Sequence, residues 1–108
     1  MKKKSASRKL LRIEQNERYQ GDEWWSWSVW VEGPKSVLDQ IKYVEYTLHP
    51  TFVEPVQKKS NRGNKFKLST SGWGVFPIYA EAVKKDGSVI HLRHQLKLHY
   101  PSGESNTY

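Results

Sequence analysis

The stretch EWWSWSVWVEGP, residues 23–34, decides the fold, because apolar and polar side chains alternate along it. Two tryptophans and two valines fall on one face, and serines and a glutamate fall on the other. The apolar positions are Trp25, Trp27, Val29 and Val31. A period of two predicts a β-strand with one buried face. Gly33 and Pro34 end this strand, because proline has no N–H to donate to a neighbouring strand and restricts the residue before it.

Similar alternation on both sides of this stretch predicts further strands in residues 10–19, 40–50, 65–72, 75–85 and 89–100. The expected inward positions are Leu11, Ile13 and Tyr19; Val44, Tyr46 and Leu48; Phe66 and Leu68; Phe76, Ile78, Ala80 and Ala82; and Ile90, Leu92, Leu96, Leu98 and Tyr100. The dipeptide Asp86-Gly87 predicts a hairpin turn between the last two strands. One helical turn is expected after Pro34, and residues 51–63 are expected to form a loop or a sheet edge.

Short antiparallel strands separated by turn residues predict an all-β fold, an immunoglobulin-like antiparallel β-sandwich of about seven to eight strands. A small barrel of the OB or SH3-like type is the alternative, because the period of two is the same in both. The 14 aromatic residues, five of them tryptophan, suit a thin core between two sheets.

Length and charge predict one domain with two tails. A chain of 108 residues holds a single compact unit. We expect the sandwich to occupy residues 10–101, with disordered tails at 1–9 and 102–108. The net charge is +7, and residues 1–18 contain seven basic side chains against two acidic ones. The absence of cysteine and of an apolar stretch of about 20 residues predicts a soluble, cytoplasmic protein with no membrane insertion.

Two loop segments contain the aromatic, hydroxyl and imidazole side chains that are best suited to bind a ligand. The first contains His49, Thr51 and Phe52 at a strand end. The second is STSGWGVF, residues 69–76, in which Trp73 lies between two glycines. Glycine weakens a strand, so this indole and the nearby backbone N–H groups are free to stack on and hydrogen-bond a flat ligand. From the residues alone, an indole folded back to cap the sandwich fits equally well.

Four segments, in order, resemble the YEATS domain family, whose members are readers built on an immunoglobulin-like sandwich. They are WSVWVEGP (residues 27–34), VEYTLHPTF (44–52), FKL followed by SGWGVF (66–68 and 71–76), and LKL (96–98). The resemblance covers residues 20–100 and is greater to prokaryotic YEATS domains. Each segment is a weak signal alone, whereas the ordered set is specific.

The resemblance implies a non-enzymatic module that binds acylated lysine, of the acetyl or crotonyl type, in an aromatic slot without a cofactor. Phe52 and Trp73 would sandwich the planar acyl-amide. The Thr51 hydroxyl would bond the amide and the Trp73 backbone N–H would donate to the acyl oxygen. His49 would orient that hydroxyl or line the slot. The partner would be a protein or peptide that carries an acylated lysine.

The resemblance assigns four further residues to the slot. Gly72 and Gly74 would give the loop its shape, and Trp24 or Trp25 would add a wall. This chain also departs from the chromatin-reading members, which carry an acidic residue near the last strand. Here residues 93–95 are Arg-His-Gln and the net charge is +7, which together predict that a basic histone tail is a poor partner.

Other function classes are less well supported. His91 and His94 point to opposite faces of a strand, and His99 lies roughly 27 Å from His91, so no metal site is expected. Half-buried His94 is expected to have a hydrogen-bond partner. No carboxylate stands near His49 and Thr51 to support catalysis.

Nucleic-acid binding and a scaffolding role that uses a sheet face remain as alternatives. The tail cations that would contact phosphates are Lys2, Lys3, Lys4, Arg8 and Lys9. The loop cations that would join them are Lys58, Lys59, Arg62 and Lys65. The same side chains also fit a solvated tail and a protected sheet edge.

Overall fold

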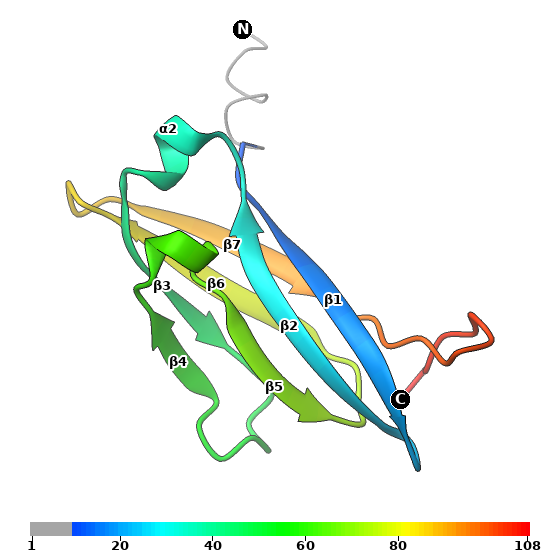
Figure 1. The fold of residues 1–108 in the computed structure, drawn as a ribbon. Helices are drawn as coiled ribbons and strands as arrows, with labels where there is room; N and C mark the ends of the chain where they lie inside the picture. The colour runs from blue at the N-terminus through cyan, green and yellow to red at the C-terminus, as the bar shows by residue number, and fades with distance from the viewer. Residues whose placement is uncertain (1–9) are drawn as a thin grey trace, which may run out of the picture.

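Two antiparallel sheets face one another in the computed structural model, which describes residues 10–108 (Figure 1). The strands are β1 (Arg12–Gly21), β2 (Trp24–Glu32), β3 (Ile41–Thr47), β4 (Val56–Lys59), β5 (Leu68–Gly72), β6 (Pro77–Lys84) and β7 (Val89–Gln95). One sheet has the order β1-β2-β5 and the other β4-β3-β6-β7. The helical elements are α2 (Lys35–Leu38) and the 3-10 turn η1 (Arg62–Asn64). The predicted immunoglobulin-like sandwich is confirmed, and the barrel alternative is wrong.

Strand β2 lies at the centre of the three-stranded sheet and has the predicted inward face. Trp25, Trp27, Val29 and Val31 are all buried, at 2% exposure or less. The alternation places every second side chain against the opposite sheet, and removing these side chains from water is the main source of stability. The inward positions predicted for β1, β3, β5 and β6 are buried or packed against the core as well.

Turns and edges follow the sequence closely. The single helical turn after Pro34 is α2, and the β6–β7 hairpin turns at Gly87, whose φ is +90°. Strand β4 is an edge strand, as expected for residues 51–63. The β1–β2 turn is unusual, because Asp22 and Glu23 both adopt left-handed φ values of 54° and 57°. Asparagine and glycine are the residues that favour this geometry.

The last strand is shorter than the sequence predicts, because β7 ends at Gln95 instead of continuing to Tyr100. Leu96 and Leu98 remain buried, so the alternation there marks inward positions beyond the end of the sheet. The Leu96 N–H donates to the carbonyl of Phe76 at 3.1 Å, and the chain then leaves β6.

The segment after β7 is folded, in place of the disordered tail predicted for residues 102–108. Residues 98–106 form a short hairpin, named here the C-terminal hairpin. Its arms are joined by the Asn106 N–H to Leu98 carbonyl bond at 2.8 Å, with a bridge between His99 and Ser105. Figure 1 shows this segment turning back toward the β1–β2 turn. The basic residues of the predicted tail, Lys2, Lys3, Lys4, Arg8 and Lys9, lie outside the described residues.

Candidate functional site

The β3–β4 loop and the segment after β5 meet at one end of the sandwich and enclose a cavity of about 390 Å³, named here the aromatic slot. The sheet pairings bring them together. Gly72 at the end of β5 pairs with Trp25, and Thr47 at the end of β3 pairs with Tyr79. The residues that line the slot are Trp24, His49, Thr51, Phe52, Val53, Ser71, Gly72, Trp73, Gly74, Val75, Phe76 and Tyr108. Every predicted site residue except Trp25 is among them.

Trp25 belongs to the core, so its predicted alternative role as a slot wall is wrong. Its side chain has 0% exposure, and its indole Nε1–H donates to the carbonyl of His99 at 2.8 Å. The rings of Tyr19 and Tyr100 pack edge-on against it, with centroids 4.9 and 5.0 Å away. Its neighbour on the opposite face of β2, Trp24, is 44% exposed and lines the slot.

His49 holds the Thr51 hydroxyl in one orientation. The Thr51 backbone N–H donates to His49 Nδ1 at 3.2 Å, so this nitrogen is the acceptor and the neutral ring carries its proton on Nε2. The Thr51 Oγ1 lies 2.9 Å from the same Nδ1 and must donate its hydrogen there. The lone pairs of the hydroxyl are therefore free to accept a hydrogen bond from a ligand N–H.

Phe52 is fixed by rings from the core. Its ring lies 6.3 Å from that of Trp27 at an interplanar angle of 82°, and 5.5 Å from that of Phe76 at 58°. Its backbone N–H donates to the carbonyl of His49 at 3.0 Å, which closes a tight turn. Phe52 is thus a rigid wall of the slot.

Trp73 is exposed to 58% and takes part in none of the ring pairs among the described residues. Its indole is therefore not folded into the core, in contrast to the capping alternative. Its backbone N–H makes no hydrogen bond with a described residue, whereas its carbonyl accepts a bond from Asn106 Nδ2 at 2.6 Å. Trp73 thus has an exposed ring and a backbone donor that has no partner among the described residues.

Neither glycine beside Trp73 is required by a left-handed backbone. The left-handed glycines are Gly21, Gly87 and Gly103. A Cβ at Gly72 would lie 3.8 Å from Phe52 Cζ, and one at Gly74 would lie 3.8 Å from the Tyr108 carbonyl oxygen. Both distances are ordinary contacts, so the lack of a side chain leaves room in the slot and does not relieve strain.

A second cavity of about 690 Å³ shares Trp24, Trp73 and Tyr108 with the slot. It also contains the two acidic residues of the β1–β2 turn. Glu23 accepts a hydrogen bond from the Tyr100 hydroxyl, and this bond raises the pKa of Tyr100 to about 12. Asp22 and Glu23 thus line the cavity next to the slot, whereas residues 93–95 line neither cavity. That a basic histone tail is a poor partner rests on residues 93–95 and on the net charge of +7, and it stays a prediction.

Sequence reasoning missed Tyr108, which lines both cavities. The polar segment around it carries no periodic pattern, so no local signal indicated a folded position. It also missed the buried indole N–H of Trp27, which has no hydrogen-bond partner among the described residues. This N–H lies 4.0 Å from the Cβ position of Gly72, behind the slot.

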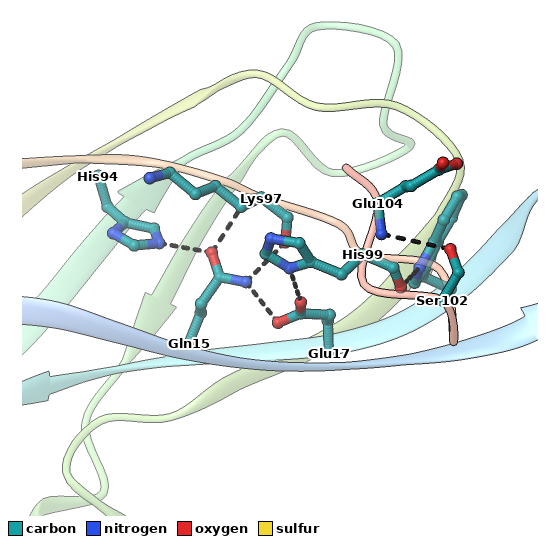
Figure 2. A network of polar contacts seen from close by, with 8 residues as sticks. Gln15, Glu17, His94, Lys97, His99, Ser102 and Glu104 are labelled. Carbon is teal, nitrogen blue, oxygen red and sulfur yellow. Dashed lines mark hydrogen bonds and ion pairs between the residues drawn. The ribbon is translucent and has the colours of Figure 1, made fainter. Parts of the chain in front are cut away.

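A polar network joins β1 to the segment after β7 (Figure 2). Gln15 Oε1 accepts from the Lys97 backbone N–H at 3.0 Å and lies 2.7 Å from His94 Nε2. Glu17 Oε2 lies 2.6 Å from His99 Nδ1, and its other oxygen accepts from Gln15 Nε2 at 2.6 Å. The prediction that half-buried His94 has a hydrogen-bond partner is confirmed.

The burial of His94 makes part of the stability depend on pH. Burial lowers the pKa of His94, the charge of Lys97 adds to this effect, and Glu14 opposes it. The unfolded chain therefore binds a proton more readily than the folded one, so this contribution to the free energy of unfolding is present above about pH 6.5 and is lost as pH falls. In urea unfolding at pH 7.5 and 5.0, we expect wild type to lose more stability than His94→Gln. Equal losses would contradict this.

The loop cations of the nucleic-acid alternative are partly engaged within the domain. Lys65 Nζ lies 2.9 Å from Glu32 Oε1, and Arg62 lies 3.0 Å from Asp39. The Lys58 ammonium lies over the ring of Tyr43 at 4.3 Å from its centroid. Within residues 10–108, no three histidine or acidic side chains are grouped to hold a metal ion, and no helix is long and apolar enough to span a membrane.

Residues 25–97 match the prokaryotic YEATS domain family. The AF-9 homolog of Saccharomyces cerevisiae is 32% identical over 78 residues, which are 68% of this chain and 34% of that protein. The chain therefore spans about a third of the length of this relative.

Two solved structures of the Yaf9 YEATS domain have a similar fold. One, bound to H3K27ac, is 25% identical with a TM-score of 0.69, and the match covers 91% of this chain and 80% of that one. The other, recognizing an H3K122suc peptide, is 25% identical with a TM-score of 0.62, over 91% and 74% of the two chains.

Proposed function

Because this chain belongs to the prokaryotic YEATS domain family, we propose that it is a non-catalytic reader of acylated lysine that binds in the aromatic slot. YEATS reader domains are non-catalytic binding modules, and structures of the similar Yaf9 domain hold acetylated and succinylated histone peptides. The observation that carries the proposal is the meeting of an exposed indole, a fixed phenyl ring and an oriented hydroxyl in one cavity.

The slot offers one group for each part of an acyl-amide. The amide N–H donates to Thr51 Oγ1, whose own hydrogen is directed to His49. The acyl oxygen accepts from the free backbone N–H of Trp73. The apolar acyl chain packs between the rings of Trp73 and Phe52, where flat groups gain stacking and burial. That these two rings stand parallel across the gap remains a prediction.

The slot also discriminates against unmodified lysine. No aspartate or glutamate side chain is among its lining residues, so an ammonium group would lose its water without gaining a side-chain counter-ion. Acylation removes the charge and leaves a planar amide with one donor and one acceptor. Because one small group is buried, we expect dissociation constants on the order of 10–1,000 μM.

The test is a titration of the domain with three peptides that are identical except for one lysine. The lysine is acetylated, crotonylated or unmodified, and binding is followed by tryptophan fluorescence and by NMR shifts of the backbone amides. We expect both acylated peptides to shift the amides of residues 71–76 and the unmodified peptide to leave them unchanged. Equal responses to all three peptides would refute the proposal.

A further inference from the structure

The C-terminal hairpin reaches the slot through one buried side chain. On the basis of the proposed function, we propose that Asn106 is a positioning residue for acyl-lysine binding. Its amide fastens the backbone of Trp73 to the hairpin, so that the indole is held in place before the ligand arrives.

The side chain of Asn106 is buried, and both ends of its amide make hydrogen bonds. It is 7% exposed and is the only buried polar residue in the described part of the chain. Its Nδ2 donates to the carbonyl of Trp73 at 2.6 Å, and its Oδ1 accepts from the Tyr108 N–H at 3.2 Å. Buried amides that are satisfied at both ends fix the segments they join.

The hairpin provides a firm base for this contact. Leu98 is fully buried, and its carbonyl accepts from the Asn106 N–H at 2.8 Å. The carbonyl of His99 accepts a hydrogen bond from the indole N–H of core residue Trp25. The His99 ring lies within hydrogen-bond distance of the Glu17 carboxylate on β1 (Figure 2). A turn with Gly103 at φ +94° then returns the chain toward the slot. The position of Asn106 is thereby tied to the core.

The Trp73 loop has few other restraints. Among the described residues, the Asn106 amide makes the one hydrogen bond to the backbone between Trp73 and Val75. The Trp73 ring has no aromatic partner, and both of its neighbours are glycine. Without Asn106 the loop would sample more conformations, and a ligand would have to order it on binding. Asn106 therefore acts on affinity through Trp73.

The experiment compares Asn106→Asp and Asn106→Ala with Thr107→Ala, an exposed neighbour that serves as the control. Asp keeps the shape and the acceptor but removes the donor to Trp73, and Ala removes the side chain without adding charge. Backbone ¹⁵N order parameters of residues 72–75 and the dissociation constant of the acetyl-lysine peptide are measured for each. We expect both Asn106 variants to lower the order parameters in this loop from about 0.85 to about 0.6 or less, and to bind about threefold to tenfold more weakly.

The loop measurement separates this proposal from the proposed function. If wild type binds no acetyl-lysine peptide while the Asn106 substitutions still make residues 72–75 more mobile, the proposed function is refuted and the positioning role of Asn106 is supported. Unchanged order parameters of residues 72–75 in folded Asn106→Asp and Asn106→Ala would overturn the positioning role. Unfolding of both variants would also overturn it, because Asn106 would then hold the domain together and not the loop.

Discussion

Replacement of Trp73 with alanine is expected to weaken acetyl-lysine binding by about thirtyfold or more, with little change in stability. A buried aromatic anchor at the centre of a small interface typically contributes about 2 kcal/mol or more. Trp73 provides one face of the slot and the backbone donor beside it. Because the indole is 58% exposed and outside the core, its removal leaves the sandwich intact.

The matched control for Trp73→Ala is Trp30→Ala. Trp30 is a half-buried tryptophan of β2 that lies outside the slot, with Lys67 over its ring at 5.6 Å. Isothermal titration with the acetyl-lysine peptide should show a loss for Trp73→Ala and none for Trp30→Ala. Binding by Trp73→Ala within twofold of wild type would be incompatible with an aromatic slot that acts as proposed.

The second large effect is expected at Trp25, where alanine should cost about 3–5 kcal/mol of unfolding free energy. The substitution empties a fully buried position between Tyr19 and Tyr100 and removes the donor to the His99 carbonyl. Small domains are stable by only about 5–15 kcal/mol, so much of the protein should be unfolded at modest urea concentrations.

Urea unfolding followed by circular dichroism measures this effect, with Trp24→Ala as the control on the adjacent residue. Trp24 is 44% exposed, so its removal should change the unfolding free energy by about 1 kcal/mol or less. If Trp25→Ala were as stable as Trp24→Ala, the assignment of Trp25 to the core would be wrong.

Most of the fold was predictable because one physical pattern determines it. The alternation in β2 places Trp25 and Trp27 inward, which marks one face of this strand as buried. The period of two does not by itself separate a sandwich from a barrel. The same alternation places Trp24 and Trp25 on opposite faces of the strand. The family resemblance left both as candidates for the slot wall, whereas the period of two alone selects Trp24.

The slot residues followed from the resemblance, whereas the hairpin behind them could not be predicted. Residues 102–108 are polar and aperiodic, which is the composition of a disordered tail. Asn106 is ordered by the carbonyl of Trp73, 33 residues earlier, and a partner so distant leaves no local trace in the sequence. Leu96 and Leu98 led to the opposite error, a predicted strand that is too long, because their side chains remain buried after β7 has ended.

The pairing of β2 with β5 joins residues 25–29 to residues 68–72, across about forty positions of the chain. Contacts of such large sequence separation form slowly, because a long loop must close before they are made. During synthesis on a ribosome, both sheets can form only after β6 has left the exit tunnel, and the C-terminal hairpin can form only later still. We therefore expect the slot to form only after β5 has paired with β2, and an N-terminal fragment that lacks β5 to bind no acylated lysine.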